Sequence, residues 1–386
     1  MSGLAEFHDE LRAVARDLLA AASPLVTGGE PGRVDLSQLA KAGWLGLDVP
    51  EAQGGSGATF AEVAVVLEEI GRAAAATSML GTVLTVGALG AVERSTARDE
   101  LLSGVADGEL RATVALPGDD GVLGGHTGFV IERDGATTRL AGQARFVPDA
   151  PGADRVLVVP DDPSSGLVLV EIAPDDRVGV TPSVLVEGTQ GGRAEVAPGG
   201  DVEVRPVPVV DATRSLGEIA VDGATVDPDH IWPLTTSLRH LSDRAALAVA
   251  IDAVGVAGGA LDATVAYAAE RRQFGRPIGS FQAVKHACAN VAVELTISRR
   301  LVGDAVAAYV ADAPEAHLAV SMAKAHAVET AVAAAGTALQ LHGGIGYTWE
   351  HGLHVLVKRA ALDRSLYGSP AAHRSRVSQR YGATTS

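Results

Sequence analysis

The sequence of 386 residues contains little cysteine and no long uncharged apolar run. Cys288 is the only cysteine, which excludes an intrachain disulfide and a zinc site made of several thiolates. A single thiol fits a reducing cytoplasm, where we expect the protein to reside. Because no stretch of about 20 apolar residues is free of charge, we expect no membrane span. The N-terminal stretch MSGLAEFHDELRAVARDLLAAASP predicts an amphipathic helix and no export signal, since acids occur near its start.

Positive charge is also scarce. Lysine and arginine together number 31 against 47 acidic residues, which gives a net charge of −16. This excess of negative charge argues against nucleic acids and anionic membranes as partners. A polyanionic ligand would therefore need a local basic patch. The balance of 20% charged and 47% hydrophobic residues is that of a globular protein, and the length predicts two or three domains.

The periodicity of apolar residues changes twice along the chain. Residues 1–111 show helical spacing, residues 112–233 show short β-branched runs separated by turns, and residues 234–386 return to helical spacing. We therefore expect an N-terminal α-helical domain, a middle β-barrel or sandwich domain and a C-terminal four-helix bundle. Within the last domain the spacing predicts helices over 245–269, 283–310 and 315–341. The final residues, YGATTS, are expected to be disordered.

A first motif, ERRQFGRPIGSFQAVKH, spans residues 270–286. Its arginines end one predicted helix, and Gln273 and Phe274 lead through a glycine-proline turn into the next. An arginine fork suits phosphate oxygens, and an aromatic ring beside it can cover a flat ligand. The alternative is a helix end stabilised by cations, with Phe274 filling the core.

A second motif, LQLHGGIGYTWEHGLH, spans residues 339–354. Gly343, Gly344 and Gly346 end a long predicted helix and permit a close backbone approach, while Gln340 offers an amide one turn earlier. The cluster is not a dinucleotide-binding fingerprint, because no strand precedes it and the glycine spacing differs.

In this order, and behind an α, β, α layout, the two motifs make the chain resemble the acyl-CoA dehydrogenase family of flavoproteins. The resemblance covers essentially the whole sequence, including GWLGLDVPEAQGGSG, VLEEIGRA, AGQARFVPDAPGADRVLVV and ALDATVAYAAERRQFGRPIGSFQ. It implies an FAD-dependent α,β-desaturation of an acyl-CoA thioester, in which a glutamate removes the α proton. It also implies a tetramer in which each FAD is shared between two subunits.

The resemblance assigns the residues that a subunit offers to its neighbour's FAD. Arg271, Gln273 and Phe274 match the family's Arg-x-x-Phe-Gly motif, and Gln340, Gly343 and Gly344 match its Gln-x-x-Gly-Gly motif. Arg271 would neutralise the pyrophosphate, and the glycines would let backbone amides approach it.

The segments that would face the subunit's own flavin ring differ from the family pattern. Where the family usually shows Thr-Glu-Pro-x-x-Gly-Ser-Asp, this chain reads TVALPGDDGVLGG, and the next segment carries Phe146, Val147 and Pro148 in place of an aromatic followed by Ile-Thr or Ile-Ser. A proline at that place removes a hydroxyl and a backbone donor.

The catalytic glutamate is missing at both places where the family carries it. Alignment on the turn RSLYGSPAAHR places Tyr367 at the usual position, and the position on an earlier helix is Ala245. We therefore predict no catalytic residue in this chain. Asp243 and Asp363 could act as relocated bases, although both are expected to be solvated surface acids. His342 and His373 could titrate near neutrality but are expected to cap helix ends at the surface.

These features favour the base-lacking subunit of an α2β2 acyl-CoA dehydrogenase, a type associated with actinobacterial steroid side-chain oxidation. Its expected partner is a second acyl-CoA dehydrogenase subunit that carries the glutamate, and its expected substrate is an acyl-CoA. One alternative is a homotetramer with a relocated base, or a flavin oxidase such as a nitroalkane oxidase. Another is a flavin-free scaffold subunit.

Overall fold

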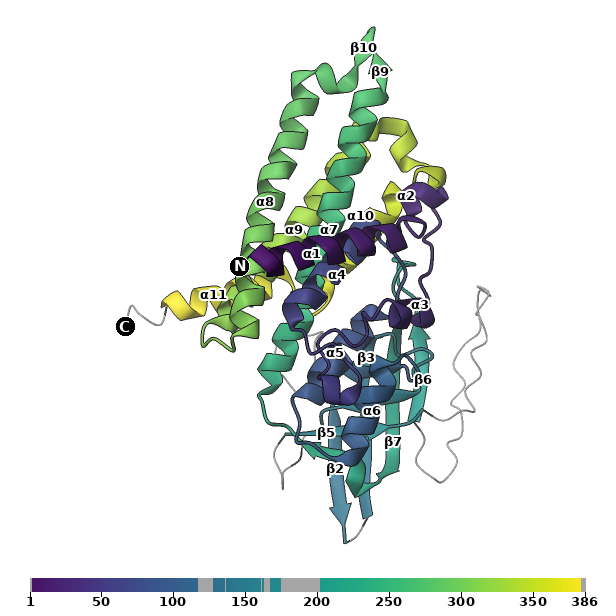
Figure 1. Cartoon of the computed structure of the whole chain (residues 1–386), viewed down its shortest axis with the longest axis vertical. Helices are drawn as coiled ribbons and strands as arrows, with labels where there is room; N and C mark the ends of the chain where they lie inside the picture. The colour runs from purple at the N-terminus through teal and green to yellow at the C-terminus, as the bar shows by residue number, and fades with distance from the viewer. Residues whose placement is uncertain are drawn as a thin grey trace, which may run out of the picture.

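A computed structural model describes residues 2–382 apart from 117–127, 136, 161, 163–166 and 175–201. Helices open the chain, two β-sheets follow, and long helices complete it (Figure 1). This order agrees with the fold predicted from the periodicity. The opening helices are α1 (Ser2–Ala20), α2 (Pro24–Thr27), α3 (Leu36–Lys41), α4 (Phe60–Ala73), α5 (Met79–Gly90) and α6 (Thr96–Ala106).

Local sequence signals define the ends of α4, the N-terminal helix that packs most extensively on the rest of the molecule. Thr59 caps it, because its hydroxyl accepts the Ala61 N–H at 3.2 Å and its own N–H donates to the Glu62 carboxylate at 2.8 Å. The helix ends at Ala73, and the following Ala74 has a φ of +46° in the left-handed region. Between these limits the buried face of α4 packs against α7 (Leu238–Glu270), and α1 covers its other side.

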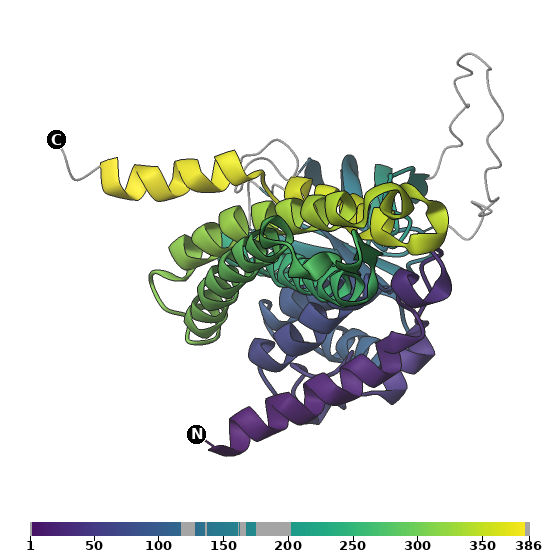
Figure 2. The ribbon, with the colours of Figure 1, turned by 90° about the horizontal axis from the view of Figure 1, so that it is seen from above.

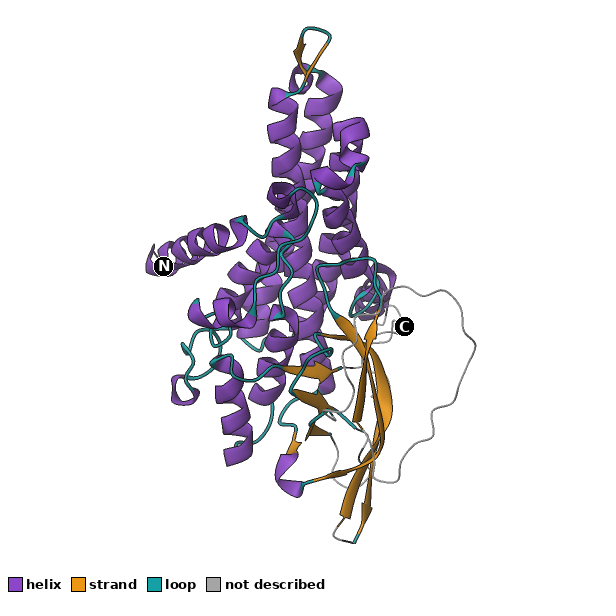
Figure 3. Ribbon diagram, turned by 90° about the vertical axis from the view of Figure 1, so that its right-hand side faces the viewer, coloured by secondary structure: helices purple, strands orange, loops and turns teal. Residues whose placement is uncertain are grey.

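The middle of the chain forms two four-stranded sheets among the described residues (Figure 3). One has the order β1-β4-β5-β8, with β1 and β4 parallel, and the other has the antiparallel order β2-β3-β7-β6. Side chains from both sheets share an apolar core. The strands are β1 (Ala112–Ala115), β2 (Phe129–Asp134), β3 (Thr137–Pro148), β4 (Arg155–Val158), β5 (Val168–Ile172), β6 (Val202–Val207), β7 (Leu216–Val226) and β8 (Ile231–Pro233).

Long alanine-rich helices form the C-terminal part. They are α7, α8 (Gln282–Val310), α9 (Ala316–His342), α10 (Leu353–Ser365) and α11 (Pro370–Gly382). A short hairpin of β9 (Arg272–Gln273) and β10 (Arg276–Pro277) lies at the far tip of the molecule, between α7 and α8 (Figure 1). Tyr381 and Gly382 belong to α11, so the expectation of disorder is wrong for them, and the last four residues lie outside the described part.

Helix α7 is long and apolar enough to cross a membrane by composition, yet 89% of its most apolar window is buried inside the protein. It is the central helix of the structure, in contact with α4, α8, α9 and α10. Its burial explains why its sequence is apolar on nearly every side.

Close packing of α7 on α4 depends on glycine. A Cβ at Gly255 would lie 1.9 Å from the Glu68 carbonyl oxygen, and one at Gly71 would lie 2.1 Å from the Asp252 carbonyl oxygen. The two helices therefore meet through backbone atoms at these positions, which a methyl group on either side would push apart.

We predict that Gly255→Ala lowers stability by about 1–3 kcal/mol, because the methyl overpacks this contact. Gly303→Ala is the matched control, since its Cβ would enter open space in α8. That change should stabilise by up to about 1 kcal/mol through helix propensity. Thermal unfolding of both variants measures the difference, and equal melting temperatures would contradict the packing argument.

Candidate functional site

The first predicted motif forms the tip of the molecule. Arg271 ends α7, and its N–H donates to the Tyr267 carbonyl at 2.8 Å. Gln273 closes β9, and Phe274 follows with a φ of +51° and 91% of its surface exposed. The alternative in which Phe274 fills the core is therefore wrong. Its ring lies edge-on to Phe281 at 6.1 Å, on the outside of the protein.

The second predicted motif ends α9. Gln340 is exposed, and the helix stops at Gly343, whose backbone (φ +63°, ψ −141°) favours glycine. A Cβ at Gly343 or Gly344 would meet nothing within 4 Å, so both backbones face open space. The imidazole of His342, just before them, stacks on Tyr267 with a ring-centroid distance of 4.2 Å.

This stack brings the two motifs to the same end of the α7 and α9 helices. Tyr267 stands one turn before Arg271, and His342 directly precedes Gly343. All six predicted residues are exposed, and the Arg271 guanidinium has no ion-pair partner in the part of the chain that the structure describes. This surface could contact one side of a flat, anionic ligand, because it offers an unpaired cation, an amide, an exposed ring and open glycine backbones. They do not enclose such a ligand by themselves.

The segment expected beside the subunit's own flavin ring has a different character. Phe146 sits in an irregularity of β3 with a φ of +57°, and Arg145 lies over its ring at 5.4 Å. Val147 and Pro148 are buried, and the Pro148 carbonyl accepts a hydrogen bond from the Thr113 hydroxyl at 2.5 Å. The segment thus offers neither a hydroxyl nor, at Pro148, an N–H. The rest of the altered loop, from residue 117, lies outside the described residues.

The turn that carries Tyr367 is tightly fixed. Tyr367 is 5% exposed with a φ of +53°, and His373 Nε2 donates to its carbonyl at 3.0 Å. The Lys324 ammonium, fully buried in α9, donates to the carbonyls of Asp363 at 2.8 Å and Gly368 at 3.3 Å. Desolvation of Lys324 lowers its pKa to about 7, against the opposing effect of Asp363. Sequence reasoning missed Lys324, although a lone lysine in an alanine-rich helix is a visible signal.

Neither candidate for a relocated base is a surface acid, which corrects that expectation. Asp363 is fully buried and pairs with Arg214 at 3.2 Å. Burial raises its pKa well above the usual range, helped by the nearby Asp252. Asp243 is 4% exposed, and burial raises its pKa to about 6 against the attraction of Arg376 and Arg239. Ala245, two residues further along α7, is fully buried.

Both histidines considered as surface caps are buried as well. His373 is 0% exposed, and burial lowers its pKa to about 4. His342 is 4% exposed, and its Nδ1 donates to the Ala338 carbonyl at 2.7 Å. Burial also lowers the pKa of His342. The two imidazoles therefore support the turn at Tyr367 and the end of α9 as neutral groups.

Comparison with known proteins identifies the family. The profile for the acyl-CoA dehydrogenase N-terminal domain matches residues 4–109, and that for the acyl-CoA dehydrogenase C-terminal domain matches residues 239–382. The protein belongs to the acyl-CoA dehydrogenase family, whose members are oxidoreductases that act on CH–CH bonds.

Two similar sequences come from mycobacteria. Acyl-CoA dehydrogenase IpdE2 of Mycolicibacterium smegmatis is 30% identical over 330 residues, which cover 86% of this chain and 82% of that protein. Acyl-CoA dehydrogenase FadE34 of Mycobacterium tuberculosis is 31% identical over 88% of this chain, which spans only 42% of that longer protein.

Solved structures show the same fold over nearly the whole chain. A variant of the Tcur3481-Tcur3483 steroid ACAD superposes with a TM-score of 0.79 at 29% identity, covering 99% of this chain and 100% of the other. The ChsE4-ChsE5 complex of M. tuberculosis gives a TM-score of 0.82 at 25% identity, with 98% of each chain covered. A glutaryl-CoA dehydrogenase of M. smegmatis, solved in complex with FADH2, shares the fold at 18% identity, with a TM-score of 0.81 over 97% of this chain and 94% of the other.

The buried Asp243 predicts a pH dependence of stability. Its pKa is raised in the folded state to about 6 from an unfolded value of 3.8, so folding holds the proton more tightly and stability falls as the pH rises from about 4 to 6. Asp243→Asn should therefore stabilise the protein by about 2–3 kcal/mol at pH 7.5, with the gain shrinking towards pH 4. Melting temperatures across this range measure it. The exposed Asp17→Asn serves as control, and an equal effect of both substitutions would contradict the assignment.

Proposed function

We propose that this chain is the base-lacking subunit of an FAD-dependent acyl-CoA dehydrogenase complex and donates half of an FAD site to a partner subunit. The observation that carries the proposal is that, in this one chain, the residues expected to bind a neighbour's FAD are present and the expected catalytic glutamate is not. The six residues expected at the FAD pyrophosphate and adenine lie exposed at one end of α7 and α9, whereas Tyr367 fills the place of the catalytic glutamate.

Each donated residue has a role that follows from its chemistry. Arg271 would neutralise pyrophosphate charge, Gln273 and Gln340 would donate amide hydrogens, and Phe274 would cover a flat ring. Gly343 and Gly344 would bring backbone N–H groups close to the phosphate oxygens. FAD, when bound, supplies the acceptor for the substrate's β hydrogen. The α proton would be removed by a glutamate of the partner, since neither Tyr367 nor Ala245 offers a carboxylate.

The external surface of the C-terminal part supports an assembly with a second subunit. In the view from above, α11 extends away from the body of the molecule (Figure 2). Large apolar side chains are exposed on the long helices (Val293, Ile297 and Met322), at the tip (Phe274) and in the connection between α9 and α10 (Trp349). Apolar area of this kind is typical of a surface that another chain covers.

The substrate class is proposed from the relatives. The similar structures include a steroid ACAD and the two-protein ChsE4-ChsE5 complex. We therefore propose a steroid side-chain CoA thioester as the substrate and an α2β2 assembly with two FAD sites, located in the cytoplasm. A homotetramer that uses Asp243 as its base is the second candidate, because burial raises the pKa of Asp243 to about 6.

The donated half-site is tested with Arg271→Ala in the complex purified after co-expression with a glutamate-bearing acyl-CoA dehydrogenase. Loss of a charge-assisted contact of about 1.5–3 kcal/mol should weaken FAD binding roughly 10- to 150-fold. The melting temperature of the apo complex should stay unchanged, because Arg271 is exposed. Gln340→Ala should act in the same direction but more mildly, since a neutral donor contributes less.

Arg94→Ala, an exposed arginine of the N-terminal part, is the control and should leave FAD retention unchanged. The reference measurement is the number of FAD molecules per tetramer, which should be two. Four FAD in a homotetramer of this chain, with activity, would support the second candidate. A complex that contains no FAD would support the alternative in which this chain is a flavin-free scaffold subunit. An unchanged FAD content in Arg271→Ala would overturn the proposed half-site.

We also predict that Tyr367→Glu restores little or no dehydrogenase activity to the chain alone. A carboxylate at this turn would supply the missing base, but Phe146, Val147 and Pro148 of β3 still lack the hydroxyl and N–H groups expected beside a flavin ring. Turnover of an acyl-CoA with an artificial electron acceptor measures the result. Strong activity from this single substitution would show that the segment is competent to hold the flavin.

A further inference from the structure

A small cavity lies between the N-terminal helices and the sheets. It has a volume of about 150 Å³, more than one water molecule needs but below the roughly 300–1,000 Å³ typical of sites for organic ligands. Its wall comes from the segments before α3 and α5, the start of β1, the end of β3 and the loop before β7. None of the six residues proposed for the FAD half-site lines it.

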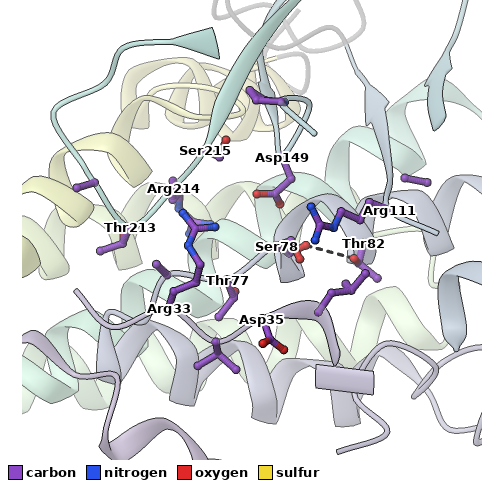
Figure 4. A pocket seen from close by; sticks show the side chains of 16 residues that line it. Arg33, Asp35, Thr77, Ser78, Thr82, Arg111, Asp149, Thr213, Arg214 and Ser215 are labelled. Carbon is purple, nitrogen blue, oxygen red and sulfur yellow. Dashed lines mark hydrogen bonds between the residues drawn. The ribbon is translucent and has the colours of Figure 1, made fainter. Parts of the chain in front are cut away.

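Three arginines converge on this cavity. Figure 4 shows Arg33 and Arg214 on one side and Arg111 on the opposite side, each extending towards the space between them. The guanidinium groups of Arg33 and Arg111 have no ion-pair partner among the residues that the structure describes. Two unpaired cations at one small cavity are a marked feature in a chain whose net charge is −16.

Arg214 adds a buried hydrogen-bond donor without an acceptor. Its side chain is 8% exposed, and Nη2 forms an ion pair with Asp252 at 3.1 Å and a hydrogen-bonded ion pair with Asp363 at 3.2 Å. Its Nε is buried and has no hydrogen-bond partner in the described structure. A buried donor left unsatisfied costs about 1–3 kcal/mol, so an acceptor at this point would be favourable.

Neutral donors complete the lining. The hydroxyl groups of Thr77, Ser78 and Ser215 border the cavity, and α5 begins beside it with its first N–H groups. The Thr213 hydroxyl also lines it but donates to the Asp211 carboxylate at 2.7 Å. One of these, the Gly81 N–H, already donates to Asp149 Oδ2 at 2.8 Å. A helix N-terminus next to arginines favours negative charge, and the Asp149 carboxylate partly meets that preference.

We propose that this cavity binds a small tetrahedral oxyanion: phosphate, sulfate, or a phosphate group at the end of a larger molecule. The volume admits one such group, and arginine forks match its oxygens bidentately. Arg33 and Arg111 would supply its charge neutralisation, and Arg214 Nε would gain its missing acceptor. The proposal does not rest on the FAD half-site, and either can fail alone.

Asp149 makes the binding dependent on pH. Burial raises the pKa of Asp149 to about 6, against the Gly81 N–H and the attraction of Arg214, Arg33 and Arg359. Its carboxylate is therefore charged at pH 7.5 and repels an oxyanion, and becomes neutral at pH 5. The other acid that lines the cavity is Asp35, which caps α3 through the Gln38 N–H. Oxyanion affinity should rise as the pH falls through 6.

The test uses sulfate, whose charge stays constant between pH 5 and 8, and measures its affinity for the full chain by calorimetry. Arg33→Gln and Arg111→Gln should each weaken sulfate binding about tenfold or more. Both positions are exposed, so the fold should survive, whereas Arg214 belongs to the buried ion network and is left intact. Arg94→Gln is the matched control and should bind sulfate normally. Unchanged affinity in both Arg33→Gln and Arg111→Gln would overturn the proposal.

Asp149→Asn supplies a gain of function that no misfolded variant could mimic. It keeps an acceptor for the Gly81 N–H and removes the competing charge, so sulfate should bind more tightly at pH 7.5 and the affinity should no longer change between pH 7.5 and 5. A variant that binds more weakly, or that keeps the wild-type pH dependence, would count against the site.

The source of the oxyanion is distinguished by competition. Inorganic phosphate should displace sulfate if the cavity takes a free ion. If it takes the phosphate of a larger molecule, coenzyme A should displace sulfate at lower concentration than inorganic phosphate does, and dephospho-coenzyme A should not. Displacement by neither phosphate nor coenzyme A would contradict the proposed ligand chemistry.

Discussion

The ion pair between Arg359 and Asp252 holds the three parts of the chain together. Both side chains are buried, at 1% and 2% exposure, and two hydrogen bonds of 2.9 and 2.6 Å join them across α10 and α7. The same guanidinium donates to the Ala75 carbonyl in the N-terminal part and to the Thr213 hydroxyl beside the sheets, each at 2.9 Å. Removing one partner of such a buried pair typically costs about 3–5 kcal/mol, because the other charge is left unpaired.

This network reaches the turn that would carry a catalytic base. Arg214 joins Asp252 to Asp363 at the end of α10, and Lys324 donates to the carbonyls of Asp363 and of Gly368 within the turn. The turn is thus shaped by buried groups that need no carboxylate at Tyr367. On the proposed function, tyrosine in place of the glutamate would remove a reactive group and leave its support in place, so that the fold persists without the catalytic role.

The sequence predicted those features that depend on local pattern. Apolar periodicity located α8 and α9 to within a residue or two, and the two motifs were rightly expected at helix ends. The burial of Asp363 and His373 was not predictable in this way. Asp363 is tolerated inside because Arg214, 149 residues away in sequence, pairs with it, and no periodicity encodes such a contact. For Phe274 the sequence left two places open, over a flat ligand or in the core, and its 91% exposure excludes only the core. Nothing in the sequence pattern decides between these places.

The proposed half-site, exposed on an acidic protein, would have an energetic consequence for assembly. The charge of −16 repels FAD everywhere except near local cations such as Arg271, and the open glycines beside it cannot exclude water from a ligand. FAD would therefore bind well only where a second subunit closes the other side. A ligand that binds only the assembled form stabilises that form by mass action, by roughly 2.7 kcal/mol at a hundredfold excess over its Kd. FAD binding would therefore contribute to the free energy of association of the two subunits.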